Sequence, residues 1–367
     1  MINNSQKNTT YFTHGFHPYP AKYTPQLVNK YLSMYCRKGN IILDPFCGSG
    51  TTVVEGAING INSVGIDLNP IAYIISKAKS NRYEESDICL INKIIDQIKE
   101  INGVPTNIEI PDFPNRSHWF QDNVCLELAD LKAKINIVEN QNVKDLLLCA
   151  FSKIIVRVSN QDSEVRYTAK NKNIQNGTVY SLFVETLLNY VDILKSSEFQ
   201  ILAKTEIFNG DTIIELQRFN DNYFDFIITS PPYINTFDYY LYHKLRMFWL
   251  DYDHRYVRQK EIGNHHRIDT KDFETAKKEY VDSISSIMNE LSRVSKPKSN
   301  FVMIIGDGIV SGITIDMSQV IFEICQNSNY KIQSIESVNL SEITRSFNRK
   351  FSNASKNEHS IILTNMK

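Results

Sequence analysis

The stretch "NIILDPFCGSGTTVVEGAINGINSVGIDLNP", from Asn40 to Pro70, decides the fold. It predicts a strand over 41–43, a loop over 44–50, a helix over 51–59 that Gly60 stops, and a second strand over 63–66 that ends at Asp67. A β-loop-α-β unit of this kind builds parallel sheets that helices cover on both faces. The stretch therefore predicts an α/β fold.

The loop of this unit has the composition of a cofactor cradle. Gly48 and Gly50 allow a tight turn and a close approach of a ligand to the backbone, and the helix that begins at Thr51 directs its first N–H groups toward that ligand. Asp67, 19 residues after Gly48, ends the second strand, where a carboxylate can accept hydrogen bonds from both hydroxyls of a ribose. The pattern predicts a nucleoside-containing cofactor. A nicotinamide dinucleotide stays an alternative, although Val53 replaces the third glycine of its usual motif.

A second informative stretch is "YFDFIITSPPYIN", from Tyr223 to Asn235. The apolar run over 226–228 predicts a buried strand, and Pro231 and Pro232 must end it because proline has no N–H for a sheet ladder. Ligands of open α/β sheets bind at the carboxyl ends of strands. The rigid loop would hold fixed acceptors beside an aromatic ring, which suits a flat ligand that carries an amino group. An ordinary proline-rich loop is the alternative.

Together these stretches resemble a known family, the S-adenosylmethionine-dependent DNA amino-methyltransferases. "DPFCGSGTT" (44–52) is similar to their methionine-binding loop, and "TSPPY" (229–233) to their catalytic tetrapeptide. "HGFHPYPAKYTPQL" (14–27) and "FNGDTIIEL" (208–216) are similar to two further cofactor motifs of the family, in a consistent order. The resemblance implies a class I (Rossmann-like) methyltransferase fold, a mixed sheet flanked by helices, here with a helical insertion.

The resemblance also implies S-adenosyl-L-methionine as the cofactor and a role for individual residues. The residues implied are His17, Lys22, Tyr23 and Thr24 over the methionine end; Asp44, Pro45, Phe46, Cys47, Gly48, Ser49, Gly50, Thr51 and Thr52 around its amino and carboxylate groups; Asp67, Leu68 and Asn69 at the ribose; and Gly210 and Asp211 at the adenine. Structural alternatives stay open for three of them: a solvated charge for Lys22, a helix cap for Asp211 and a satisfied loop histidine for His17.

The tetrapeptide Ser230, Pro231, Pro232 and Tyr233 is implied as the catalytic site. By the resemblance, the Ser230 hydroxyl and the Pro231 carbonyl accept hydrogen bonds from an exocyclic amino group, and Tyr233 stacks on a base flipped out of the duplex. Serine in the first position favours cytosine-N4 over adenine-N6 as the target. The chain has no Pro-Cys dipeptide, which argues against a cytosine-C5 methyltransferase.

The order of the motifs predicts three parts. Residues 1–80 would be the cofactor-binding part of the methyltransferase domain, residues 81–205 a helical insertion, and residues 206–367 the rest of the domain. Two segments are candidates for DNA contact: 157–173, which could equally be a solvated loop, and 238–275, whose residues 245–250 could equally be core. Further strands are predicted over 301–305 and 360–363, with a basic loop that contains Arg345 and Arg349.

Composition limits the remaining choices. The 367-residue chain has a formal net charge of -1, so a nucleic acid would have to be held by local patches. Six scattered cysteines without a C-x-x-C pair predict neither a metal site nor disulfides. No signal peptide and no membrane span is recognised, which predicts a cytoplasmic protein.

The sequence thus predicts a site-specific DNA methyltransferase. Its expected partners are double-stranded DNA and a cognate restriction endonuclease or recognition subunit, with a monomer or a homodimer as the assembly. The alternatives are an adenine-N6 DNA methyltransferase, an RNA methyltransferase, a non-catalytic DNA-binding subunit and an NAD-dependent dehydrogenase.

Overall fold

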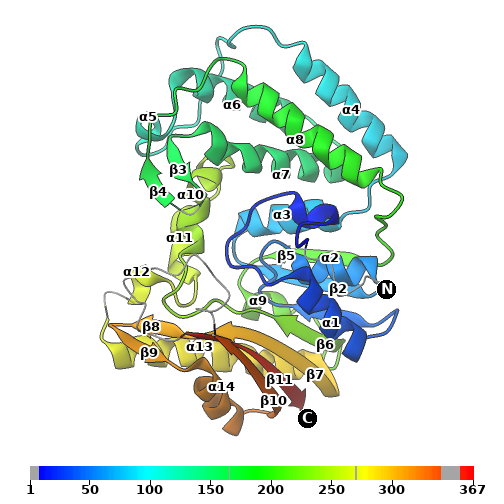
Figure 1. Ribbon diagram of the computed structural model, residues 1–367, viewed down its shortest axis with the longest axis vertical. Helices are drawn as coiled ribbons and strands as arrows, with labels where there is room; N and C mark the ends of the chain where they lie inside the picture. Colours follow the sequence, from blue (N-terminus) through cyan, green and yellow to red (C-terminus); the bar gives the residue numbers. More distant parts are fainter. Residues whose placement is uncertain (1–7, 165, 269–270, 340–355) are drawn as a thin grey trace.

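The fold is described from a computed structural model, over residues 8–164, 166–268, 271–339 and 356–367. Seven strands form its central sheet, in the order β10-β11-β7-β6-β1-β2-β5 (Figure 1). The strands are β1 (Ile41–Asp44), β2 (Asn62–Asp67), β5 (Thr205–Asn209), β6 (Phe224–Thr229), β7 (Ser295–Gly306), β10 (Tyr330–Asn339) and β11 (Asn357–Asn365). The predicted strands at 41–43, 63–66, 226–228, 301–305 and 360–363 are all present.

The topology is that of the predicted class I (Rossmann-like) fold. β1 pairs in parallel with β2 and β6, β2 with β5, and β6 with β7. β11 inserts antiparallel between β7 and β10, which makes the sheet mixed. The strand order reverses between β1 and β6, and ligands of such sheets bind at this reversal.

Helices cover both faces of this sheet (Figure 1). The helices that pack on it are α1 (Pro25–Tyr35), α2 (Thr51–Ile58), α3 (Pro70–Ser80), α9 (Thr212–Leu216), α13 (Phe273–Val294) and α14 (Met317–Gln326). Side chains alternate between the two faces: Ile42 and Ile228 share a core with residues of α1, whereas Leu43 and Ile227 share one with residues of α13 and α14. Burial on both faces explains why these strands read as continuous apolar runs.

The predicted insertion is helical. After the short helix η1 (Phe12–Gly15) of the N-terminal segment, the remaining elements before β5 are α4 (Glu85–Lys99), α5 (Arg116–Trp119), α6 (Asp122–Asn136), α7 (Gln141–Val158), β3 (Gln161–Ser163), β4 (Arg166–Ala169) and α8 (Thr178–Leu194). Their apolar side chains form one core that also includes residues of α3. The domain boundaries at residues 80 and 205 stay predictions.

Of the two candidate DNA-contacting segments, 157–173 differs from the loop that its composition suggested. Segment 157–173 contains the antiparallel hairpin β3–β4, which the sequence did not indicate. Segment 238–275 begins with α10 (Tyr239–Trp249), followed by α11 (His254–Lys260) and α12 (His265–Ile268). Leu245 and Trp249 of α10 are buried in the core of the insertion, as the structural alternative for this segment proposed.

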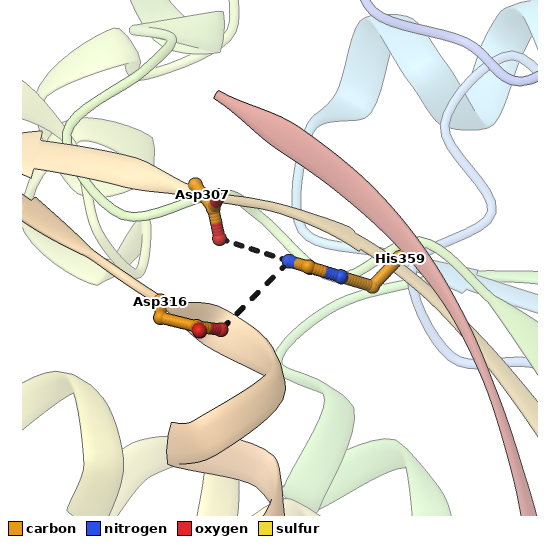
Figure 2. A group of neighbouring side chains, drawn as sticks. All are labelled: Asp307, Asp316 and His359. Carbon is orange, nitrogen blue, oxygen red and sulfur yellow. Dashed lines mark hydrogen bonds and ion pairs between the residues drawn. The ribbon is translucent and has the colours of Figure 1, made fainter. Parts of the chain in front are cut away.

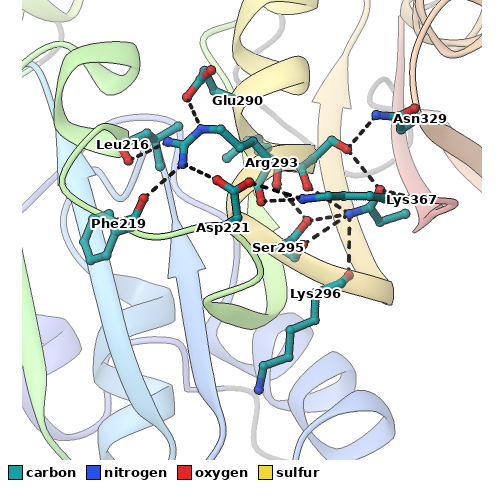
Figure 3. A network of polar contacts seen from close by, with 12 residues as sticks. Leu216, Phe219, Asp221, Glu290, Arg293, Ser295, Lys296, Asn329 and Lys367 are labelled. Carbon is teal, nitrogen blue, oxygen red and sulfur yellow. Dashed lines mark hydrogen bonds and ion pairs between the residues drawn. The ribbon is translucent and has the colours of Figure 1, made fainter.

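A polar network anchors the lower part of the sheet (Figure 3). The Arg293 guanidinium, at the end of α13, donates to the carbonyl of Leu216, the last residue of α9, and to that of Phe219 beyond it, at 3.0 Å each. It also donates to the Asp221 carboxylate at 3.0 Å. The Lys367 ammonium donates to the Arg293 carbonyl at 3.2 Å. Because Arg293 satisfies the last carbonyl of α9, it holds that short helix against α13.

The small hairpin β8 (Gly308–Val310) and β9 (Ile313–Ile315) completes the described elements. Arg345 and Arg349 of the predicted basic loop lie outside the described residues. Among the helices that the structure describes, none is both long and apolar enough to cross a bilayer.

Candidate active site

An open cavity with a volume of about 440 Å³ lies at the carboxyl ends of β1 and β6, where the strand order reverses. Its size falls in the range of small-molecule sites. The predicted residues that line it are Lys22, Tyr23, Phe46, Cys47, Gly48, Ser49, Thr51, Asp67, Leu68, Asn69, Asp211, Ser230 and Pro232. The cofactor motifs and the tetrapeptide therefore meet around one space.

The loop between β1 and α2 is held in a shape that requires glycine. Gly48 and Gly50 have φ angles of +50° and +80°, which non-glycine residues rarely adopt. A Cβ atom on Gly50 would lie 2.9 Å from Oγ and 3.1 Å from Cα of Ser76. Ser76 in turn donates its hydroxyl hydrogen to the Gly48 carbonyl at 2.7 Å. The loop thus packs closely on α3 and leaves its other side open to the cavity.

Asp67 connects this loop to the end of β2. Its carboxylate accepts hydrogen bonds from the backbone N–H groups of Gly48 and Asn69, both at 2.8 Å. Burial raises the pKa of Asp67 to about 6, and the nearby Asp44 charge adds to the rise. The carboxylate keeps lone pairs for further donors from the cavity, such as ribose hydroxyls.

Two buried polar atoms on the cavity wall have no hydrogen-bond partner within the part of the chain that the structure describes. They are Oγ of Ser49 and Nδ2 of Asn69, on side chains that are 2% and 3% exposed. Buried polar groups are rarely left unpaired in a folded protein, so a polar ligand is the expected partner. A donor and acceptor set of this kind fits the hydroxyl, amino and carboxylate groups of S-adenosylmethionine.

Several predicted residues lie outside the cavity wall. They are His17, Thr24, Asp44, Pro45, Gly50, Thr52, Gly210, Pro231 and Tyr233. His17 is buried, with its ring nitrogens 2.6 Å from the Pro18 carbonyl and 3.1 Å from the Ser152 hydroxyl, which is the arrangement of a satisfied histidine. Its predicted contact with the cofactor stays a prediction.

Asp44 lies beneath the cavity. Its carboxylate is fully buried and accepts hydrogen bonds from the hydroxyls of Thr229 and Tyr23, both at 2.6 Å. Burial raises the pKa of Asp44 above its ordinary value. Because Thr229 ends β6 and Tyr23 lines the cavity, Asp44 ties the tetrapeptide strand to the N-terminal segment in this structure.

For Asp211 and Lys22 the sequence left open both a cofactor contact and a structural alternative, and the structure shows features of each. Asp211 caps α9 by accepting from the Ile213 N–H at 3.0 Å, and it also lines the cavity. The Lys22 ammonium donates to the His14 carbonyl at 3.3 Å on the cavity wall, where burial lowers its pKa. Lys22 is therefore not a fully solvated charge.

The tetrapeptide loop is braced by hydrogen bonds on several sides. The Ser230 hydroxyl, on the cavity wall, donates to the Tyr233 hydroxyl oxygen at 3.3 Å, and Tyr233 donates to the Glu358 carboxylate at 3.0 Å. Burial raises the pKa of Tyr233 well above its ordinary value, so this phenol remains a donor at neutral pH. The Tyr280 hydroxyl donates to the Pro232 carbonyl at 2.8 Å.

Tyr19, Tyr239 and Glu261 are among the polar wall residues that sequence reasoning missed. The rings of Tyr19 and Tyr239 lie nearly parallel, 6.1 Å apart. Glu261 accepts from the N–H groups of Tyr239 and Tyr240 at 2.7 and 3.1 Å, and burial raises its pKa to about 8. Tyr19 lies inside the quoted 14–27 motif, and Tyr239 and Glu261 lie inside segment 238–275. Both stretches had therefore been singled out from the sequence, although these residues had not. The α13 residues Asp282, Ser283 and Ser286 also line the cavity, and no motif indicates them.

A separate cluster brings together Asp307, Asp316 and His359, whose ligand-type atoms lie within 4.8 Å of one another (Figure 2). The His359 ring contacts the Asp307 carboxylate at 2.9 Å through Nε2 and the Ser337 hydroxyl at 2.7 Å through Nδ1. Asp307 also accepts from the Met317 N–H at 3.0 Å, and Asp316 caps α14. These partners already use the ring nitrogens and much of both carboxylates. The cluster therefore connects β7, β11 and α14 through polar contacts, and we call these three side chains the polar pin.

Comparison with known proteins adds to this geometry. Residues 1–78 match the family described as DNA methylase, the N6/N4 group. The chain is 31% identical over 268 residues to the type II methyltransferase M.MvaI of Kocuria varians, with 66% of this chain and 59% of that protein covered.

Two further relatives carry the same description. The chain is 28% identical to the type II methyltransferase M.BsoBI of Geobacillus stearothermophilus, with 69% of this chain and 56% of that protein covered. It is 23% identical to M.MjaII of Methanocaldococcus jannaschii, with 83% and 73% covered. The chain thus spans less than two thirds of the length of M.MvaI and of M.BsoBI. The matched motifs, the sheet topology and the cavity that joins them agree: the chain is similar to the S-adenosylmethionine-dependent DNA amino-methyltransferase family.

Proposed function

We propose that this protein transfers a methyl group from S-adenosylmethionine to the exocyclic amino group of a base in double-stranded DNA, with cytosine-N4 as the preferred target. One observation carries the proposal: Ser230 and Pro232 share a single cavity with the glycine loop and Asp67. A nucleoside site and the proposed acceptor Ser230 would therefore stand side by side. A nicotinamide enzyme would gain nothing from such an acceptor.

The cavity wall offers a partner for each end of the cofactor. Asp67 would accept hydrogen bonds from the ribose hydroxyls, while Ser49 and the N–H groups at the start of α2 would face the methionine end. Asp211, with Leu68, would face the adenine. When bound, S-adenosylmethionine supplies an electrophilic methyl group on a sulfonium. Lys22 and Tyr23 would cover the ligand from the N-terminal segment.

Ser230 is oriented to accept rather than to donate toward the cavity. Its hydroxyl hydrogen points to Tyr233, so the oxygen lone pairs are free for an amino hydrogen of the target base. The Pro231 carbonyl would accept the second amino hydrogen. Two acceptors in fixed positions would draw the nitrogen toward a tetrahedral shape and orient its lone pair, and catalysis of this kind is mainly positioning.

A base inside a duplex must leave the stack before its amino group can reach Ser230. We infer that the base is flipped out and that Tyr233 supplies an aromatic face for it, at a cost of about a few kcal/mol in lost stacking. The Gly306 backbone behind the Tyr233 ring leaves no room for a side chain, since a Cβ atom there would lie 2.6 Å from Tyr233 Cε2. Gly306 therefore allows the Tyr233 ring to pack closely on the backbone of β7.

The choice of base rests on the first residue of the tetrapeptide. Serine is a neutral acceptor, which suits cytosine-N4 in the family pattern, whereas an acid or amide at this position is more frequent in adenine-N6 enzymes. We further propose, from the kinship with type II methyltransferases, that the protein is the protective partner of a restriction endonuclease and acts as a monomer or a homodimer.

The test is incubation with S-adenosylmethionine and mixed-sequence duplex DNA, followed by mass analysis of the released nucleosides. We expect N4-methylcytosine from the wild type and little from Ser230→Ala or Tyr233→Ala. Ser33→Ala, on the exposed side of α1, is the matched control and should retain full activity. N6-methyladenine would overturn the base assignment and keep the site. Cofactor binding without any methylated base in DNA, with RNA tested alongside, would overturn the proposed substrate.

A further inference from the structure

The hairpin β3–β4 of the insertion is joined to α10, although about 80 residues of sequence separate them (Figure 1). Arg246 of α10 is 1% exposed, and its guanidinium donates to the Glu164 carboxylate in the hairpin turn at 2.5 Å and to the Ser152 carbonyl at 3.0 Å. The Lys244 ammonium lies over the Tyr167 ring, 5.7 Å from its centroid. Arg246 is buried and Glu164 is partly exposed, so loss of Glu164 would leave a buried guanidinium without its charged partner, which is costly. This contact holds the hairpin against α10.

The outer part of this unit has an unusual charge balance. We call residues 166–177 the hairpin arm; the two acids of the hairpin, Asp162 and Glu164, precede it in the sequence. From Arg166 to Gly177 it reads "RYTAKNKNIQNG", with three cations, four amide side chains and no acid, in a chain whose formal net charge is -1. Arg166 is 74% exposed, at 3.6 Å from Asp162. Lys170 is exposed and has no ion-pair partner among the described residues.

The hairpin arm lies near the cavity. Tyr239, the first residue of α10, lines the cavity, and Arg246 follows it by seven positions. A helix rises about 1.5 Å per residue, so the anchor of the hairpin lies about 10 Å along α10 from the cavity wall. One strand of a duplex carries a phosphate about every 3.4 Å, and this offset corresponds to about three base pairs.

Further cations lie on the elements that lead to the cavity. Lys260, at the end of α11, is exposed and also lines the cavity, and Arg255 of the same helix is 76% exposed. β3–β4, α10, α11 and α12 follow one another down one side of the molecule (Figure 1). A polyanion bound to the hairpin arm could therefore continue past α11 to the cavity mouth.

We propose that the hairpin arm is a DNA-binding surface, on which Arg166 and Lys170 contact backbone phosphates a few base pairs from the base that enters the cavity. This proposal rests on the proposed function. Cations together with amides and without acids suit phosphate contact, which supplies most of the sequence-independent affinity for DNA. The rigid connection through Arg246 would transmit the position of the duplex to α10, and from there to the cavity.

The experiment measures binding of the wild type and of Arg166→Ala/Lys170→Ala to a mixed-sequence DNA duplex, as a function of salt concentration. Each lost phosphate contact lowers the slope of log K against log[salt] by about 0.9, so the double variant should lower it by about 1.8 and bind about tenfold more weakly at low salt. The KM for DNA should rise in parallel.

Two control variants make the result specific. Lys93→Ala/Lys99→Ala on α4 removes the same charge from exposed positions of another face and should keep the wild-type slope. Arg166→Lys/Lys170→Arg keeps both charges and should restore binding. Cofactor affinity, measured without DNA, should be equal in all variants because the mutated side chains are exposed and do not line the cavity.

The possible outcomes separate this inference from the proposed function. A wild type that methylates DNA, with a hairpin variant of unchanged slope and affinity, overturns the hairpin arm as a DNA surface and leaves the enzyme assignment intact. A wild type that neither binds nor methylates DNA overturns both the proposed function and the hairpin inference. Equal losses of DNA affinity in the hairpin variant and in the α4 variant would mean that only the net charge of the protein matters. That result would also reject the inference. Tighter binding to an RNA duplex than to DNA, lost in the hairpin variant, would overturn the assignment to DNA.

Discussion

The Tyr233 hydroxyl donates a hydrogen bond to the Glu358 carboxylate across 3.0 Å, although 125 positions separate the two residues in the sequence. Glu358 pairs with Gly306 in the antiparallel ladder of β11 and β7. The last strand of the sheet therefore fixes the aromatic ring of the tetrapeptide loop. Through Tyr233 it also contacts the Ser230 hydroxyl, which predicts a positioning role for Glu358.

Glu358→Ala should lower kcat and leave cofactor affinity unchanged. A hydrogen bond to a charged group contributes about 1.5–3 kcal/mol, so the loss should be roughly 10- to 150-fold if Tyr233 orientation limits methyl transfer. Glu358→Gln keeps an acceptor and should lose less. Rates are measured in single turnover with saturating cofactor and DNA.

A double-mutant cycle decides whether the two residues act as a unit. Tyr233→Phe removes the donor and Glu358→Ala the acceptor, so the combined variant should be barely slower than the slower single variant. If the two losses multiply instead, Glu358 acts on catalysis without Tyr233 and the positioning role is wrong.

The cofactor loop allows a sharp test of glycine. Gly50→Ala places a Cβ atom 2.9 Å from Ser76 Oγ, in a residue with a φ of +80°. We expect weaker binding of S-adenosylmethionine by at least about tenfold, because the loop must shift, in addition to a backbone cost of roughly 1–2 kcal/mol in stability. Isothermal titration calorimetry measures the first effect and urea unfolding the second.

Gly39→Ala is the matched control for this prediction. Gly39 has a φ of +87°, and a Cβ atom on it would meet nothing within 4 Å. The variant should show a similar backbone cost with unchanged cofactor affinity. Equal affinity losses in both variants would mean that the Ser76 contact does not shape the cofactor loop.

The sequence indicated the parts of the site that depend on local chemistry. Glycines in a tight turn, prolines that end a strand and apolar runs buried on both faces leave clear patterns, and β1, α2, β2 and β6 follow them. It did not indicate that Asp44 points beneath the cavity, because a motif gives the residue type and not the direction of its side chain. The α13 residues of the wall lack a signal for another reason: a helix contributes isolated polar side chains through packing, with no local pattern.

Asp67 makes cofactor binding dependent on pH. Its pKa of about 6 means that the carboxylate is increasingly protonated below that pH and becomes a weaker acceptor for ribose hydroxyls. The affinity for S-adenosylmethionine should therefore rise as the pH rises from about 5 to about 7. Asp67→Asn should bind weakly at every pH and lose this dependence. A wild-type affinity that stays flat across this range would contradict the assignment of Asp67 to the ribose.

The same residue affects stability with a defined sign. Because the pKa of Asp67 in the folded protein lies above its ordinary value of 3.8, the native state holds the proton more tightly than the unfolded chain does. Between about pH 4 and pH 6, Asp67 should therefore lower the free energy of unfolding as the pH rises. Asp67→Asn removes this contribution, and urea unfolding at several pH values measures it.

Asp307 should show the opposite sign. Burial alone would raise its pKa, but hydrogen bonds from His359 and from two backbone N–H groups lower it below the ordinary value (Figure 2). The stabilisation from this carboxylate is therefore present above about pH 4 and is lost as the pH falls through its folded pKa. Asp307→Asn removes the charged acceptor that contacts His359 Nε2, so it should reduce the free energy of unfolding at neutral pH by about 1.5–3 kcal/mol. The difference between wild type and variant should shrink toward pH 3.

Asp316→Asn is the control for this last prediction. Asp316 is 63% exposed and caps α14, and asparagine caps helices as well as aspartate does, so the variant should be close to neutral. If the two variants lost equal stability, the cap and not the buried contact would hold β7, β11 and α14 together. A stabilisation of the wild type by added Zn²⁺ would likewise go against the polar pin, because in the pin the His359 nitrogens and the Asp307 oxygens already contact protein groups.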